Sequence, residues 1–131
     1  MKLRCVLSCA VLCVIAAGTV SAQDPVKVDP SHYKVETENA QVRVLRIHYG
    51  PHEKSVMHSH PNSVVTYLSD GTIKMTTPDG KSQNMTGKIG QTEYTPAGTH
   101  LPENVGDKPF EAVLVELKGG KAASKATPAK K

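Results

Sequence analysis

Two histidines separated by one residue are the clearest chemical feature of this sequence. They form the triplet His58-Ser59-His60, and five of the six histidines of the chain lie between positions 48 and 100. Residues two apart on an extended strand point to the same face, so both imidazoles would enter one space. Two neutral nitrogen donors in one space are typical ligands of a transition-metal ion. Two half-exposed polar side chains at a strand end are the alternative interpretation of the same triplet.

Cysteine chemistry is excluded from the part of the chain that we expect to be mature. All three cysteines lie in residues 1–22, which combine a basic start, an apolar run and small residues before a possible cleavage after Ala22. This pattern predicts a signal peptide and a mature chain that begins at Gln23. The apolar run, Cys5–Ala17, has 13 residues, fewer than the roughly 20 that a membrane-spanning helix needs. We therefore expect an exported protein, periplasmic or secreted, with no stable membrane anchor and no thiol for a disulfide, ligand or nucleophile.

Short strands are the elements that must position the histidines. Between Gln23 and Lys118 there is no long apolar stripe with a helical period, and β-rich segments recur between Gly, Pro and Asp turns. These segments are 42–49, 63–68, 72–77, 91–95 and 111–117. They predict one all-β domain over residues 23–118, either a small antiparallel barrel or a sandwich. Residues 119–131 hold no large apolar side chain, and we expect a disordered Lys/Ala-rich tail there.

Composition and charge argue against a nucleic-acid partner. The chain has 131 residues, 38% apolar and 21% charged, which is near the globular average. Its net charge is +4, but six of the 16 basic residues lie in the two terminal segments. The ten that remain stand against all 12 acidic residues, so the central part carries −2. A basic face able to release counterions from a phosphate backbone is therefore not expected.

The stretch between Gly50 and Asn104 resembles the two motifs of the cupin superfamily. The first motif runs Gly, five residues, His-x-His, three or four residues, Glu, six residues, Gly. Here the His-x-His triplet and Gly71 match, whereas His52 stands at the opening glycine and Val64 at the glutamate. The second motif is matched, one residue short before its histidine, by Gly90, Pro96, Gly98, His100 and Asn104. On these residues the chain is identified as a small, single-domain member of this superfamily.

The resemblance implies a double-stranded β-helix, a jelly-roll barrel, with a metal site built by His58, His60 and His100. The cofactor it implies is a divalent transition metal: iron, zinc, manganese or nickel. Without the glutamate, three neutral imidazoles leave the charge of the ion uncancelled, so the site should attract anions and keep positions open for a small molecule. A three-His arrangement also occurs among thiol dioxygenases of the same superfamily.

We therefore expect an exported cupin that binds a divalent metal through three histidines and a small, anionic ligand at the open positions. Two alternatives stay open: a metal-free cupin that serves as a binding or assembly module, and a three-His iron dioxygenase-like enzyme. No general base stands out in the sequence, and the fold alone does not fix the chemistry, so whether the chain is an enzyme also stays open. A homodimer is expected on the resemblance to small cupins alone.

Three further residues are candidates for ligand binding. Glu93 lies in the strand that leads to Pro96 and could serve as a replacement ligand or base; a solvated strand residue is the alternative. Glu103 follows His100 by three residues and could act from the mouth of the barrel. Tyr67 is one of the four tyrosines on which stacking against a sugar would depend, because the chain has no Trp and one Phe.

Overall fold

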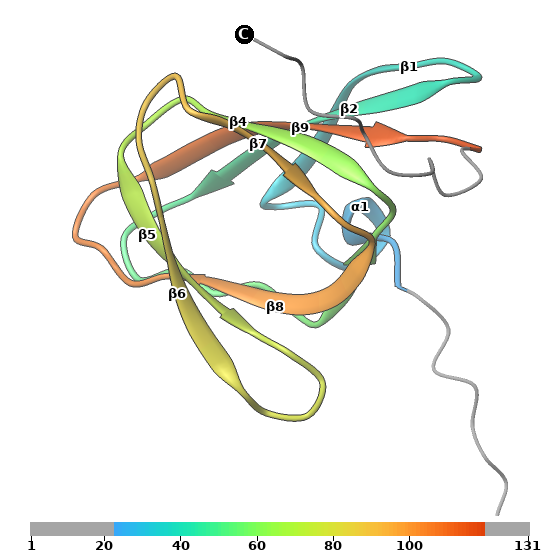
Figure 1. Cartoon of the computed structure of the whole chain (residues 1–131). Helices are drawn as coiled ribbons and strands as arrows, with labels where there is room; N and C mark the ends of the chain where they lie inside the picture. The colour runs from blue at the N-terminus through green and yellow to red at the C-terminus, as the bar shows by residue number, and fades with distance from the viewer. Residues whose placement is uncertain (1–22, 120–131) are drawn as a thin grey trace, which may run out of the picture.

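Alternation of large apolar and polar residues builds the central strands. The computed structural model describes residues 23–119, and in it β2 (Val42–Tyr49) and β9 (Phe110–Leu117) pair antiparallel along their whole lengths. Every second side chain of each strand points into the core, as the two-residue period of a strand requires. The other strands are arranged around this pair to form a barrel (Figure 1).

Nine strands and one short helix make up the described part of the chain. In chain order the remaining elements are α1 (Pro25–Val28), β1 (Tyr33–Glu38), β3 (His58–His60), β4 (Ser63–Tyr67), β5 (Gly71–Thr76), β6 (Ser82–Gly87), β7 (Thr92–Thr95) and β8 (Gly98–Asn104). One sheet has five strands in the order β1-β2-β9-β4-β7, and the other has four in the order β3-β8-β5-β6. All strand pairs are antiparallel, and the two sheets form the walls of the barrel (Figure 1). The all-β jelly-roll prediction is confirmed.

The core lies between the two sheets and is rich in aromatic side chains. All four buried aromatic residues belong to the five-stranded sheet. The buried apolar residues are Tyr33, Leu45, Ile47, Tyr49, Val65, Tyr67, Ile73, Phe110, Ala112 and Leu114. Aromatic side chains bury large areas each, so they account for a large share of the hydrophobic stabilisation.

Two glycines make room for the aromatic rings. A Cβ on Gly87, at the end of β6, would lie 2.2 Å from the ring of Tyr67, and one on Gly71 would lie 2.8 Å from the ring of Phe110. Real Cβ atoms do not approach other atoms so closely. Glycine at both positions therefore leaves the space that these two rings occupy in the barrel wall.

The expected strands are found within a few residues of their predicted bounds, but not every element was predicted. α1, β1 and β6 were not expected, and the residues of β8 were expected as a motif without a strand. β1 and β6 are mostly exposed and polar, so they lack the apolar alternation that marks β2. The predicted signal peptide at 1–22 and residues 120–131 of the predicted tail lie outside the described residues. Within residues 23–119, no helix is long and apolar enough to cross a membrane.

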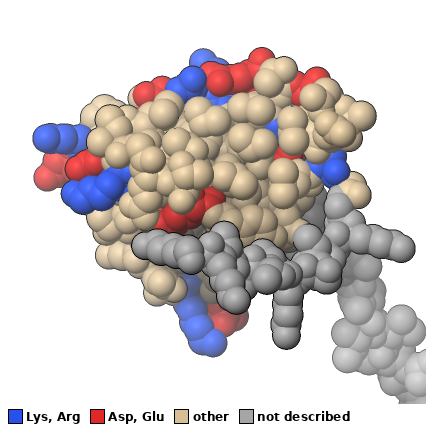
Figure 2. All heavy atoms as spheres, turned by 45° about the horizontal axis from the view of Figure 1, so that its top comes forward, with Lys and Arg blue, Asp and Glu red and all other residues tan. Residues whose placement is uncertain are grey.

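Charged side chains of both signs are mixed on the surface. Figure 2 shows Lys and Arg next to Asp and Glu at the margins of a broad uncharged area.

A row of apolar and aromatic side chains crosses the outer side of the five-stranded sheet. It follows the strand register across four strands and consists of Val44, Val115, Val64 and Tyr94. Tyr94 at the end of this row is 60% exposed.

Candidate metal centre

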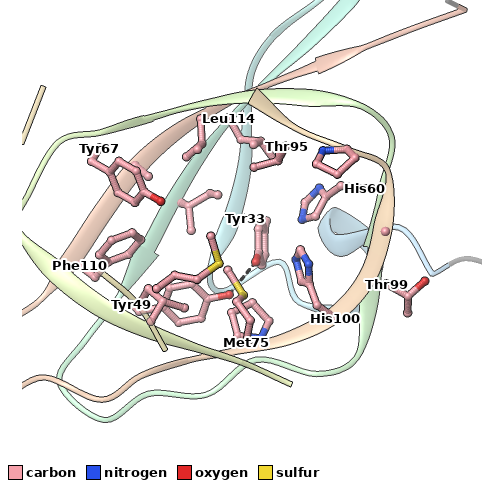
Figure 3. Close-up of a pocket in the computed structure, with 18 of the residues that line it drawn as sticks. Tyr33, Tyr49, His60, Tyr67, Met75, Thr95, Thr99, His100, Phe110 and Leu114 are labelled. Atoms are coloured by element: carbon pink, nitrogen blue, oxygen red, sulfur yellow. Dashed lines mark hydrogen bonds between the residues drawn. The ribbon is translucent and has the colours of Figure 1, made fainter. Parts of the chain in front are cut away.

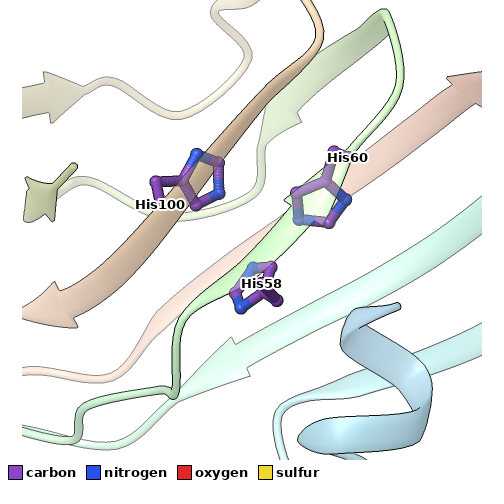
Figure 4. Close-up of side chains that lie close together, drawn as sticks. All are labelled: His58, His60 and His100. Carbon is purple, nitrogen blue, oxygen red and sulfur yellow. The ribbon is translucent and has the colours of Figure 1, made fainter. Parts of the chain in front are cut away.

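Pairing of β3 with β8 brings three histidines together. In this antiparallel pair, His58 lies opposite His100, and His60 lies two residues along β3 on the same face. The ring centroids are 4.9 Å apart for His58 and His60, 5.1 Å for His58 and His100, and 5.3 Å for His60 and His100. One nitrogen from each ring lies within 4.8 Å of the other two. Figure 4 shows the three imidazoles facing one another across the two strands.

Hydrogen bonds on the Nδ1 side direct the two imidazoles of β3. His58 donates from Nδ1 to the carbonyl oxygen of Val56 at 2.8 Å, and His60 donates from Nδ1 to Oε1 of Glu116 at 2.7 Å. In a neutral imidazole, a proton on Nδ1 leaves the lone pair on Nε2 free for a ligand. Nε2 of His58 is buried and has no hydrogen-bond partner among the described residues. A buried nitrogen without a partner is costly unless something binds it, and a metal ion among the three rings would do so.

The same environment keeps His58 and His100 neutral. Burial, with a smaller contribution from the neighbouring His60, lowers the pKa of His58 to about 4. Burial also lowers the pKa of His100 to about 3, with smaller effects from His60 and His58. Near pH 7 both rings are uncharged, which is the form that donates a lone pair to a cation. The donor set therefore fits a divalent transition metal.

An apolar pocket of about 340 Å³ opens beside the histidines. Figure 3 places His60 and His100 at one side of it and the rings of Tyr67 and Phe110 at the other. Its lining includes Ile47, Val65, Ile73, Met75, Met85 and Leu114. The hydroxyls of Tyr33 and Tyr49, which also face it, are hydrogen-bonded to each other at 2.7 Å. Among the described residues that line the pocket, none is Lys, Arg, Asp or Glu.

Solved structures share this barrel. A cupin domain from Bordetella pertussis Tohama I is 27% identical with a TM-score of 0.62, and the match covers 66% of this chain and 92% of that one. A conserved protein with a double-stranded β-helix domain from Klebsiella pneumoniae is 26% identical with a TM-score of 0.54, over 66% of this chain and 76% of that one. The chain belongs to the cupin superfamily.

More distant cupins share the fold alone. An RmlC-like cupin family protein from Methanocaldococcus jannaschii is 20% identical with a TM-score of 0.53, over 69% of this chain and 84% of that one. No protein-family model matches the sequence, and no curated protein matches it.

The structure corrects the position assigned to the missing cupin glutamate. Counting along the motif placed Val64 in that position, but Val64 points to the outer side of β4, opposite Tyr94 and Val115. Val65 points inward and lines the pocket with His60. The motif allows three or four intervening residues, and β4 begins at Ser63 in the phase that turns Val65, the residue after four intervening ones, inward. Either way an apolar side chain takes the place of the acid.

A carboxylate that the sequence analysis missed lies directly behind the cluster. Glu116 on β9 is 2% exposed, and its two oxygens accept hydrogen bonds from Nδ1 of His60 and, at 2.6 Å, from Nε of Arg43. Burial raises the pKa of Glu116, but the bonds from His60 and Arg43 outweigh it and hold the pKa below its usual value. A charged acid on the inner side of an apolar strand is the signal that could have identified it.

The three predicted ligand-binding residues lie in different places. Tyr67 lines the pocket at the side away from the histidines (Figure 3). Burial raises the pKa of its hydroxyl, and nearby Glu93 raises it further. Glu93 lies opposite Val65 in the pair of β4 with β7 and does not line the pocket. Glu103 points out of the barrel and pairs with Lys74 at 2.6 Å. The structure therefore brings neither glutamate together with the three histidines.

Proposed function

We propose that this cupin binds a divalent transition metal through His58, His60 and His100, and that a small ligand with an anionic donor atom takes the remaining coordination positions. The observation that carries the proposal is the convergence of three imidazole nitrogens within 4.8 Å, with Nε2 of His58 buried and without a hydrogen-bond partner in the part of the chain that the structure describes. Iron, zinc, manganese and nickel all accept such nitrogen donors.

The charge of the site favours an anionic ligand. Three neutral imidazoles cancel none of the two positive charges of the ion, and Val65 stands where an acid would have cancelled one. No cationic side chain lines the pocket within the described residues, so the negative atom of a ligand would find its counter-charge at the metal. When bound, the metal supplies Lewis acidity toward that donor atom.

The pocket favours a ligand with an apolar body. Its aliphatic, methionine and aromatic walls would remove such a body from water, at about 25 cal/mol per Å² of apolar surface buried. A volume of about 340 Å³ lies at the lower end of the range for small-molecule sites. We infer a small molecule with an acidic or otherwise anionic head and an apolar remainder.

Metal content tests the proposal directly. We expect about one zinc or iron ion per chain after reconstitution at pH 7.5, and loss of that ion in His58→Ala and His100→Ala. His48→Ala is the matched control, because His48 is an exposed histidine on β2 outside the cluster. A wild-type chain that holds no metal after reconstitution would instead be a metal-free binding module. Oxygen uptake by the iron-loaded chain with small thiols separates an enzyme from a binding protein.

We also propose that the chain is exported through cleavage after Ala22. The support is the pattern of residues 1–22, with its basic start, apolar run and small residues before the cleavage position. Expression of the full chain in a bacterial host should give a periplasmic or secreted product whose N-terminal residue is Gln23. A cytoplasmic product that retains residues 1–22 would contradict it.

A further inference from the structure

The segment of residues 23–29, here called the N-terminal segment, lies against the strand that carries two of the histidines. β8 pairs with one edge of β3, and at the middle of β3 the amide of Ser59 donates to the carbonyl oxygen of Gln23 at 2.8 Å. Helix α1 follows directly and contacts β3. An aspartate stands at each end of this helix: Asp24 is its N-cap and Asp29 its C-cap.

Asp24 begins a chain of ionic hydrogen bonds that ends at His60. Its Oδ2 accepts from Nη1 of Arg43 at 2.8 Å, and the same guanidinium donates from Nε to Glu116 at 2.6 Å. Glu116 in turn accepts from Nδ1 of His60 at 2.7 Å. The Arg43 and Glu116 side chains are only 16% and 3% exposed, so these charges are poorly screened by water.

Asp29 stands behind the other histidine of β3. It is 6% exposed and accepts hydrogen bonds from Ser55 at 2.5 Å, from His32 at 2.7 Å and from Ser31 at 2.7 Å. Because the hydroxyl proton of Ser55 is directed to Asp29, the Ser55 oxygen presents a lone pair to Nδ1 of His58, 3.4 Å away. This contact is longer than the bond from His58 to Val56, so the effect of Asp29 on His58 is weaker than that of Glu116 on His60.

We propose that Asp24 and Asp29 are positioning residues of the metal centre, which act through Arg43–Glu116 on His60 and through Ser55 on His58. This inference depends on the proposed function, because it concerns the same three ligands. Carboxylates behind a metal-bound histidine fix its ring and increase its basicity. In this cupin they also place negative charge behind a ligand set that has none of its own.

Substitutions that remove charge and keep shape test the proposal. Asp24→Asn retains a capping side chain for Val26, so α1 should still form. Asp70→Asn is the matched control: Asp70 also accepts from a backbone amide and a cationic side chain, Ile89 and Lys88, but lies outside the cluster. We expect Glu116→Gln to weaken zinc binding by about 10- to 100-fold, and Asp24→Asn and Asp29→Asn by about 3- to 10-fold. Asp70→Asn should bind zinc as the wild type does.

A double-mutant cycle separates positioning from loss of stability. If Asp24 acts through Glu116, Asp24→Asn should have little further effect on zinc affinity in the Glu116→Gln background, although it still lowers thermal stability. Cobalt-loaded Asp24→Asn should also show a shifted visible absorption band, which a destabilised but unaltered site would not.

Two results would overturn this inference, and a third would remove the proposed function on which it depends. Wild-type zinc affinity in both aspartate variants overturns it. So does an undiminished effect of Asp24→Asn on zinc affinity in the Glu116→Gln background. A wild-type chain that binds neither zinc nor cobalt would instead remove the proposed function, and the inference with it.

Discussion

The two sheets of this cupin contribute different parts of the same pocket. The four-stranded sheet supplies all three imidazoles, from β3 and β8. The five-stranded sheet supplies the buried aromatic rings and, on β9 and β2, the Glu116–Arg43 pair behind His60. The residues that would bind a metal are thus separate from those that stabilise the barrel and orient the ligands. Apart from the Glu116–Arg43 pair, whose substitution should also lower zinc affinity, substitutions in the two sheets should therefore affect different properties.

The largest expected effect is on stability and comes from the five-stranded sheet. Leu45 is fully buried on β2 opposite Leu114, and Leu45→Ala should lower the free energy of unfolding by about 2–5 kcal/mol through a cavity and lost burial. Zinc affinity of the folded variant should change little. Urea unfolding and a zinc titration measure the two quantities. Ile89→Ala, at a position 69% exposed, is the control and should change stability by less than about 0.5 kcal/mol. A large loss of zinc affinity in Leu45→Ala would show that the two sheets are not separable.

The next effect is a pH dependence that comes from the four-stranded sheet. In the metal-free chain the pKa of His58 is lowered from 6.5 to about 4 and that of His100 to about 3, so the unfolded chain takes up protons first as the pH falls. Their contribution to stability is fully present above pH 6.5 and is lost as the pH falls toward 4 and 3. For His58 the loss is about 3 kcal/mol.

Urea unfolding of the chelator-treated chain at pH 7.5 and pH 5 measures this dependence. Glu116, Asp24 and Asp29 have lowered pKa values, so their contributions are lost only below about pH 4.5, outside this interval. His58→Gln should flatten the profile, whereas His48→Gln should keep it. Equal stability of the wild type at both pH values would mean that the buried rings are not held neutral.

The sequence predicted the features that depend on local pattern. Alternation marked β2 and β9, and the His-x-His triplet with the later His100 marked the cluster that the structure brings together. Glu116 was missed because its partners, Arg43 and His60, lie 73 and 56 residues away and are brought to it only by strand register. The position of the missing cupin glutamate was assigned to Val64 instead of Val65. Which of these two neighbouring residues points inward depends on where β4 begins.

The smallest predicted effect concerns Val65, which points inward where the motif spacing had placed Val64. Val65→Glu should place an acid in the pocket beside the histidines and, in the zinc- or cobalt-loaded chain, weaken azide binding on the order of tenfold by cancelling charge. Val64→Glu, one residue earlier on the outer face, should leave azide binding unchanged. A titration of azide followed by cobalt absorption checks both variants. A larger effect from Val64→Glu than from Val65→Glu would show that Val64 occupies the glutamate position, as the motif spacing predicted.

The most direct measurement for the central claim is the number of imidazole ligands around zinc, obtained by X-ray absorption on the reconstituted chain. We expect three histidine nitrogens at about 2.0–2.1 Å, completed by an oxygen or nitrogen donor from solvent or ligand. The azide-treated sample should keep all three histidine nitrogens. A zinc environment with fewer than three imidazoles, or one unchanged in His58→Ala, would contradict a metal centre built on His58, His60 and His100.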